Sequence, residues 1–237
     1  MESEKTFIVR IATPEDHKYA ELITEEVADS AKKRGTGIAK RTPEYVINKM
    51  DQGKAVMAVN PQNEEWVGFC YIEAWQDKKY VANSGLIVNP KYRGLGVARK
   101  IKSRIFRLSR EKYPHSKIFG LTTGLAVMHI NSDLGYEPVT YSELTDDDQF
   151  WKGCQSCINY PILMSKGRKQ CLCTAMLYNP DKEKNKEREK GSVNNMNEEN
   201  EHTEKNRHFS GNYKLFARWT RFKKYILLKG INKKKQK

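Results

Sequence analysis

The sequence has 237 residues, a length that suits one domain with a sizeable extension or two small domains. Its formal net charge is +14 and only 38% of its residues are hydrophobic, which is polar for a chain that folds throughout. No stretch approaches the roughly 20 consecutive apolar residues of a membrane span, and no apolar signal region follows the acidic start, so we expect a cytoplasmic protein without a transmembrane segment.

Strands and helices alternate regularly in the first 180 residues. Thr13 with Pro14, and Thr42 with Pro43, are typical of helix starts, because threonine caps the free amides and proline fits the first turn. We expect helices over 14–33, 43–50, 97–108 and 125–134. We expect strands over 7–11, 55–59, 66–72, 81–88, 117–122 and 138–142.

A glycine-containing loop, residues 89–96, joins the strand 81–88 to the helix that begins at Val97. Free amides and the helix dipole point at such a junction, and glycines let a phosphate approach the backbone, so it suits a pyrophosphate. Plain turns also use glycine pairs, so the loop alone does not establish a site. The spacing excludes the dinucleotide-binding G-x-G-x-x-G and the phosphate loop that ends in Gly-Lys-Ser/Thr.

The order of elements, together with Arg93-x-x-Gly96-x-Ala98 after the fourth strand, resembles the GNAT superfamily of acyl-CoA-dependent N-acyltransferases. The segment Leu134-Gly135-Tyr136-Glu137 resembles the family's Leu-Gly-Phe-Glu, in the expected order. The resemblance implies an α/β fold with a mixed, largely antiparallel sheet flanked by helices and a splayed fourth strand. It also implies acetyl-CoA or another acyl-CoA as co-substrate.

The resemblance further implies which residues bind CoA. The fourth strand would offer backbone groups to the pantetheine arm, and the loop would hold the pyrophosphate. The residues at these positions are Leu86, Val88, Arg93, Gly94, Leu95, Gly96, Val97 and Ala98.

The reaction implied is direct attack of an amine on a thioester in a ternary complex, which needs a proton acceptor. Glu73, near the end of the third strand, and His129, on the last helix, are the candidates. Each could equally be a residue with no catalytic role. Asn131 occupies the position of the family's frequent tyrosine, and an amide cannot protonate the leaving thiolate.

The segment between the first two helices is basic and has no acid, and it is where this family contacts its amine substrate. Arg34, Lys40 and Arg41 there suit a carboxylate, although a solvated charge cluster would look the same. Residues 37–44, 87–93, 121–123 and 150–157 resemble compact glutamate N-acetyltransferases of arginine biosynthesis in Bacteroidetes. We therefore expect an amino-acid acceptor, glutamate first, and either an acetyl or a succinyl group.

Four of the five cysteines lie within residues 150–175. Cys154-x2-Cys157 on a turn and Cys171-x-Cys173 on one face of a strand would together suit a tetrahedral zinc ion. Cys-x-Cys is a poorer zinc knuckle than Cys-x-x-Cys, and small buried cysteines are common in proteins of reducing compartments. Zinc binding and simple packing therefore remain alternatives.

Composition divides the chain near residue 180, and most of the excess positive charge lies beyond that point. We predict one domain over 1–180 that includes the cysteine-rich segment. Residues 181–210 consist largely of Asn, Glu and Lys with almost no aliphatic residue, which predicts a disordered linker.

Residues 211–237 are expected to form a basic amphipathic tail helix, because Leu215, Trp219, Phe222 and Ile226 are spaced 4, 3 and 4 apart. Such a helix can bind an anionic membrane surface, a nucleic acid or a partner. We favour docking on its own domain or on a second subunit, which leaves a homodimer open.

Two classes of function are therefore compared. The first is an acyl-CoA:amino-acid N-acyltransferase, with another small-molecule amine as the alternative acceptor. The second is a basic regulatory or nucleic-acid-binding protein with a zinc knuckle on a GNAT-like scaffold. The intact loop from Arg93 to Ala98 favours the enzyme.

Overall fold

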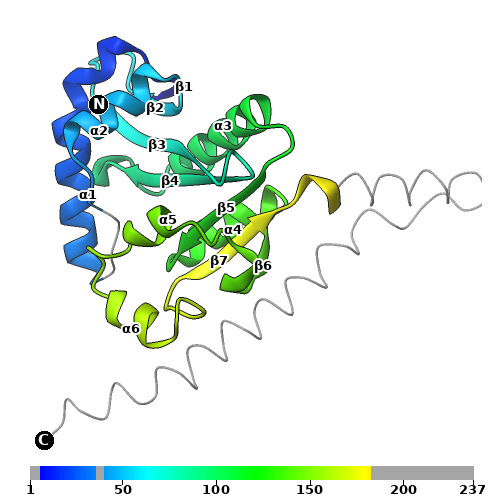
Figure 1. Cartoon of the computed structure of the whole chain (residues 1–237). Helices are drawn as coiled ribbons and strands as arrows, with labels where there is room; N and C mark the ends of the chain where they lie inside the picture. Colours follow the sequence, from blue (N-terminus) through cyan, green and yellow to red (C-terminus); the bar gives the residue numbers. More distant parts are fainter. Residues whose placement is uncertain (1–5, 36–39, 183–237) are drawn as a thin grey trace, which may run out of the picture. The chain divides into compact units, whose positions relative to one another are not determined.

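The structure, a computed structural model, describes residues 6–35 and 40–182 (Figure 1). The predicted tail helix and all but the first two residues of the predicted linker lie outside the described residues, as does the side chain of Arg34. No helix in the described part of the chain is long and apolar enough to cross a membrane.

The described residues form a seven-stranded sheet with helices on both faces. Its strands are β1 (Ile8–Ile11), β2 (Ala55–Val59), β3 (Trp66–Trp75), β4 (Tyr80–Val88), β5 (Lys117–Thr122), β6 (Glu137–Val139) and β7 (Thr174–Tyr178). The α-helices are α1 (Ala20–Arg34), α2 (Pro43–Asp51), α3 (Val97–Lys112), α4 (Leu125–Asp133), α5 (Asp148–Lys152) and α6 (Tyr160–Ser165).

The strand order is β1-β2-β3-β4-β5-β7-β6. Neighbouring strands are antiparallel except β4 and β5, which are parallel. The sheet is therefore mixed and largely antiparallel, and this confirms the predicted fold class. The connection between β4 and β5 runs through α3, as a parallel pair requires.

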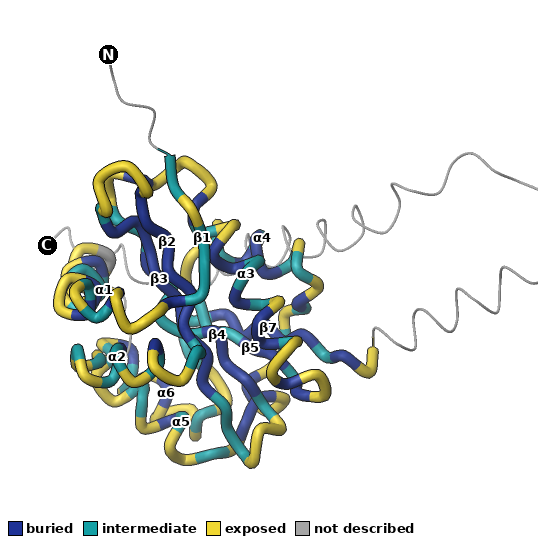
Figure 2. The backbone as a smooth tube through the Cα atoms, turned by 90° about the horizontal axis from the view of Figure 1, so that it is seen from above, coloured by how far each residue is buried: buried dark blue, intermediate teal, exposed yellow. Residues whose placement is uncertain are grey.

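Each face of the sheet has its own helices (Figure 2). One core cluster packs side chains of α1 and α2, including Ile23 and Met50, against β2 and β3, including Met57 and Phe69. The opposite face of β2 to β4 is covered by α3, whose Ile101 and Ile105 are fully buried. A further cluster, around Phe119 and Trp151, seats α5 on β5 and β7.

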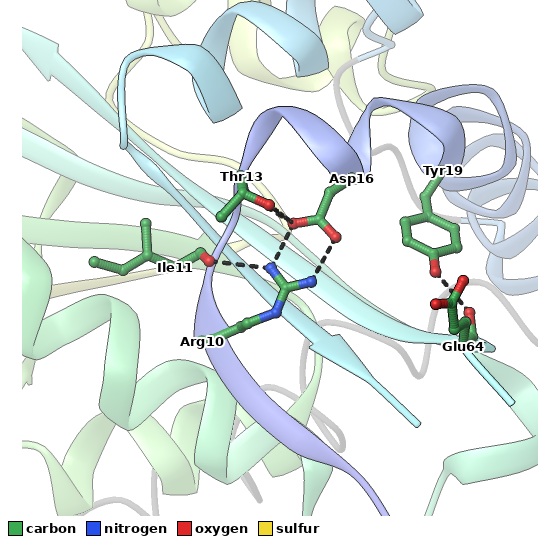
Figure 3. A network of polar contacts seen from close by, with 6 residues as sticks. All are labelled: Arg10, Ile11, Thr13, Asp16, Tyr19 and Glu64. Carbon is green, nitrogen blue, oxygen red and sulfur yellow. Dashed lines mark hydrogen bonds and ion pairs between the residues drawn. The ribbon is translucent and has the colours of Figure 1, made fainter. Parts of the chain in front are cut away.

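An ion pair between the half-buried Arg10 and the buried Asp16 fixes the start of the first helical segment (Figure 3). Arg10 of β1 makes a two-pronged contact with Asp16, at 2.6 and 2.8 Å, and the backbone amide of Thr13 donates to the same carboxylate at 2.8 Å. Burial alone would raise the pKa of Asp16, but these hydrogen bonds outweigh it and lower the pKa. Thr13 and Pro14 therefore start the segment as predicted, although its first part, Pro14–Tyr19, is a 3₁₀ helix.

Most predicted elements lie within a few residues of their expected bounds, and the exceptions are at the end of the domain. The strand expected over 138–142 is shorter, because Tyr141–Glu143 turns into a 3₁₀ helix. The helices α5 and α6 were not expected, and the strand expected to contain Cys171 and Cys173 begins only at Thr174, as β7. The prediction that Cys171 and Cys173 lie on a strand is wrong, because both precede β7 in a bend.

Candidate active site

The two parallel strands at the centre of the sheet separate after a short stretch of pairing. The register of β4 with β5 runs from Tyr80 with Lys117 to Ala82 with Phe119, and β4 then continues to Val88. Leu86 and Val88 lie half-buried on this extension. Because β5 does not pair with this extension, the backbone groups of β4 that face β5 are available there to an extended ligand.

The separation coincides with a bulge between β3 and β4. The register shifts between Phe69, which pairs with Ile87, and Tyr71, which pairs with Ser84. Gly85 lies in the bulge with a φ of +66°, and a Cβ added to it would be 2.3 Å from Cε1 of Tyr71. Only glycine fits here, because the position combines a left-handed backbone with close ring contact.

The loop after β4 has the form of an anion cradle. Gly94 and Gly96 have φ values of +84° and +77°, and no described atom lies within 4 Å of a Cβ built on either. Gly96 is the N-cap of α3, and the first turn of that helix contains Arg99 and Lys100 but no acid. Open space, free amides and positive charge fit the pyrophosphate of CoA at this helix start.

Arg93 points away from the cradle. Its Nε donates to the carbonyl of Val88 at 3.1 Å, and its Nη2 donates to Glu26 at 2.8 Å and to Ser30 at 3.0 Å. The guanidinium therefore joins the end of β4 to α1. This geometry supports positioning of the loop by Arg93 rather than direct contact with a phosphate.

Glu73 lies on the face of the sheet covered by α1 and α2 and is only 6% exposed. Its Oε2 is 3.7 Å from Nη2 of Arg41. Burial raises the pKa of Glu73, while the charge of Arg41 and hydrogen bonds from Ser84 and Arg41 act against that increase. A carboxylate with a raised pKa is suited to accept a proton near neutral pH.

Arg41 sits at the centre of a small aromatic site. Its guanidinium stacks over the ring of Tyr45 at 4.9 Å and hydrogen-bonds the side chain of Tyr71. Its Nη1 donates to the carbonyl of Lys40, whereas its buried Nε has no hydrogen-bond partner among the described residues. A half-buried guanidinium with unused capacity to donate can still accommodate an anionic ligand.

Arg41 also borders two cavities. A cavity of about 20 Å³, close to the size of one water molecule, lies between Arg41, Tyr71, Gly85 and α1. A groove of about 700 Å³ continues along α1 to Ser156 and Ile158, with Glu25, Asp29 and Lys40 on its walls. The groove is large enough for an amino acid.

The structure brings only some of the predicted site residues together. Arg41 and Glu73 adjoin each other, and Lys40 lies at the groove, where its backbone amide donates to Ser156 at 3.1 Å. His129 is on α4, which packs with α3 against β5 and β7, on the other face from Glu73. Asn131 is buried on the same helix, and its Oδ1 has no described hydrogen-bond partner.

Sequence reasoning missed Tyr71 and Ser84, which contact Arg41 and Glu73 respectively. The one available indication was Gly85, because a glycine within a strand pattern marks a bulge or a close backbone approach. Nothing in the sequence indicated which aromatic ring the bulge would meet.

The described residues give no support to zinc binding by the four clustered cysteines. No group of three or more His, Cys, Asp or Glu side chains in the described part of the chain is placed to hold a metal ion. The side chains of Cys171 and Cys173 interact with each other, and Cys157 accepts a hydrogen bond from the backbone amide of Asn159 at 3.4 Å. Burial raises the pKa of Cys154 to about 11, so this thiol stays protonated at neutral pH.

Part of this chain is similar to a known protein family. Residues 19–125 match the acetyltransferase (GNAT) family. No curated protein sequence matches the chain. The matched region includes the bulge, the loop and most of the helices and strands around them.

Solved structures share the fold at low sequence identity. The N-acetylglutamate synthase of Neisseria gonorrhoeae, complexed with coenzyme A and N-acetyl-glutamate, is 15% identical with a TM-score of 0.51. The alignment covers 75% of this chain and 36% of that protein, so this chain spans about a third of its length. A Mycobacterium tuberculosis protein in complex with CoA is 16% identical with a TM-score of 0.52, over 73% of this chain and 98% of that one.

Proposed function

We propose that this chain, whose residues 19–125 match the acetyltransferase (GNAT) family, is an acyl-CoA-dependent N-acyltransferase that acetylates the α-amine of an amino acid with a carboxylate side chain, glutamate first. The observation that supports this acceptor is the half-buried guanidinium of Arg41 at the groove beside Glu73. A likeness at 15% identity supports the fold alone, so the acceptor assignment rests on Arg41.

Acyl-CoA supplies an activated acyl group, and the residues of this chain hold and orient it. The loop from Gly94 to Ala98 receives the pyrophosphate, with Arg93 bracing the loop against α1. The β4 extension at Leu86 and Val88 aligns the pantetheine arm. These residues fit the group because the loop is open at both glycines and the first turn of α3 has no acid.

Glu73 and Arg41 have different roles toward the acceptor. Arg41 binds an acceptor carboxylate through its guanidinium, and Lys40 at the groove adds positive charge. Glu73 accepts the proton that the ammonium must lose before its nitrogen can attack, either directly or through a water molecule such as the small cavity could hold. Its raised pKa keeps it basic enough for this step.

The main alternative to glutamate is a cationic acceptor, because Glu25 and Asp29 also line the groove. A polyamine would place its positive charges against these carboxylates, whereas glutamate would place its carboxylates against Arg41. The two acceptor classes therefore depend on different residues of the same groove.

Release of free CoA, measured with glutamate, glutamine and spermidine, tests the proposal. We expect glutamate to be the best of the three, and Arg41→Ala to lower kcat/KM for it by roughly 30- to 1000-fold, as expected when a charge-assisted contact is lost. Arg41→Lys should recover little of this loss, because lysine keeps the charge but not the planar fork. Arg107→Ala, an exposed arginine on α3, serves as the matched control.

Two outcomes would contradict the acceptor assignment. If spermidine is the better substrate, the groove selects cations through Glu25 and Asp29. If Arg41→Ala acetylates glutamate normally, Arg41 does not bind the acceptor. Neither outcome would contradict the assignment of the chain as an acyl-CoA-dependent N-acyltransferase.

A further inference from the structure

The cysteine cluster is the feature of this domain that the acyltransfer reaction does not use. It joins two segments that are separate in sequence, the turn after α5 with Cys154 and Cys157, and the bend before β7 with Cys171 and Cys173. All four are free, half-buried thiols. They interact electrostatically with one another, so the fold has gathered them into one place.

The backbone of Asn159 connects the two segments. Its amide donates to Sγ of Cys157 at 3.4 Å, and its carbonyl accepts from Sγ of Cys171 at 4.0 Å. These contacts hold Cys157 and Cys171 on separate backbone groups. They do not direct either sulfur toward a common metal position.

Cys171 and Cys173 are separated by a single residue, and their side chains interact with each other. The bend at residues 172–173 shortens the separation of their backbones relative to an extended strand. Tyr141 supports the pair: its hydroxyl donates to the carbonyl of Cys173 at 3.0 Å, and its ring stacks on Trp151 at 5.8 Å.

Cys171 and Cys173 are both of intermediate burial, so the pair is partly exposed. Leu172, between the two cysteines, is 40% exposed, and Ile158 on the neighbouring turn is 70% exposed. Cys70, by contrast, is completely buried and donates to the carbonyl of Ser84 at 3.2 Å. The chain therefore contains its own unreactive thiol for comparison.

We propose that Cys171 and Cys173 form a redox-active dithiol that reacts with low-molecular-weight disulfides and closes into an intramolecular disulfide. The thiolate of Cys171 attacks one sulfur of the incoming disulfide, forming a mixed disulfide and releasing one thiolate. Cys173, after losing its proton to solvent, attacks Sγ of Cys171 and releases the second thiolate. The dithiol loses two electrons and two protons, and the incoming disulfide gains them as two thiols.

The site is next to the acceptor groove. Ser156 and Ile158 line the groove, and they lie on the same turn as Cys154 and Cys157. The inference does not depend on the proposed acceptor, because it concerns thiol chemistry that can be measured without any acyltransfer.

Oxidised glutathione is the probe. The full-length protein is reduced, freed of reductant, incubated with oxidised glutathione, blocked with N-ethylmaleimide, digested with trypsin and analysed by mass spectrometry. Cleavage after Lys169 and Lys182 places Cys171 and Cys173 on one peptide, whereas Cys154 and Cys157 fall on another. We expect the first peptide to lose two hydrogens and take up no N-ethylmaleimide.

Two variants sharpen the result. Cys173→Ser should trap a stable glutathione adduct on Cys171, because the attacking second thiol is gone. Cys157→Ser is the matched control and should leave the Cys171–Cys173 disulfide unchanged. Cys70 reports on unfolding: in the native, reduced protein it should react with N-ethylmaleimide at least about tenfold more slowly than Cys171, because it is completely buried.

Three results would overturn the proposal. One is a peptide that retains both free thiols after glutathione treatment. Another is a disulfide that links the two tryptic peptides, which would assign the reaction to a different pair. The third is about one zinc ion per chain in the purified protein, released only as the four thiols become reactive.

Discussion

The ring of Tyr71 lies directly against the backbone of Gly85, so closely that a Cβ on Gly85 would be 2.3 Å from Cε1 of the ring. The same tyrosine hydrogen-bonds Arg41 through its side chain. One residue of β3 therefore touches both the bulge of β4 and the guanidinium at the acceptor groove. Tyr71 therefore links the β4 bulge to the acceptor groove.

Gly85→Ala should destabilise the fold by roughly 2–5 kcal/mol, because it adds a left-handed backbone strain to a clash with the ring. Gly94→Ala is the matched control: its φ is similarly positive at +84°, but nothing lies within 4 Å of the added Cβ. We expect it to cost only about 1 kcal/mol. Urea unfolding measures both, and equal losses would mean that the ring contact contributes nothing.

Glu73→Gln should lower kcat by roughly 10²–10⁴-fold, the usual contribution of a general base. In the wild type, burial raises the pKa of Glu73, so activity should fall as the pH drops through that raised value and the carboxylate becomes protonated. The residual activity of the glutamine variant should lack this dependence. A pH–rate profile that is identical in both proteins would remove Glu73 from proton transfer.

The raised pKa of Glu73 also predicts how stability changes with pH. The folded state binds this proton more tightly than the unfolded state, so its contribution is complete below about 4.5, the ordinary pKa of glutamate, and is lost as the pH rises through the folded value. Glu73→Gln does not titrate, so its stability relative to wild type should improve over that range. Urea unfolding at several pH values measures the trend, and a decline would contradict the direction of the shift.

Arg93 and Glu26 provide a test of how the CoA loop is positioned. If Arg93 acts by pairing with Glu26 of α1, then Arg93→Ala and Glu26→Gln should each weaken CoA binding by a few-fold, and the double variant should be no worse than either. Calorimetric titration with CoA measures the affinities. If Arg93 instead contacts a phosphate, Arg93→Ala should cost about tenfold or more, and Glu26→Gln should not weaken binding.

Lys102 is a buried lysine of α3, only 2% exposed, with its Nζ 5.3 Å from the centre of the Tyr136 ring. Burial lowers its pKa, so the folded state binds this proton less tightly than the unfolded state. Lys102→Met should therefore stabilise the protein at pH 7 by about 1 kcal/mol or more. The gain should shrink as the pH rises toward 10.5, the ordinary pKa of lysine.

Thermal unfolding at about pH 7 and about pH 9.5 measures the effect of Lys102→Met. Arg107→Met removes an exposed charge from the same helix and should change the melting temperature little at either pH. If Lys102→Met lowers the melting temperature at pH 7, the ring of Tyr136 compensates the buried charge more than the burial costs.

The sequence by itself determined the succession of helices and strands up to β5, because Thr-Pro helix starts, glycine breaks and apolar periodicity are local features. It also indicated the glycine loop that opens α3, since Gly94 and Gly96 can adopt the left-handed backbone that the structure shows there. Arg41 and Glu73 could each be proposed separately from their chemistry and their places in the chain.

Tertiary structure alone decided which of these residues meet. Arg41 precedes α2 and Glu73 lies on β3, and their 3.7 Å approach depends on how these distant segments pack. The ion pair of Arg93 with Glu26 of α1 likewise joins residues that are far apart in the chain. The strand β7 enters between β5 and β6, and the bend before it prevents Cys171 and Cys173 from sharing a strand face. Pairings of this kind connect distant segments, so no local pattern specifies them.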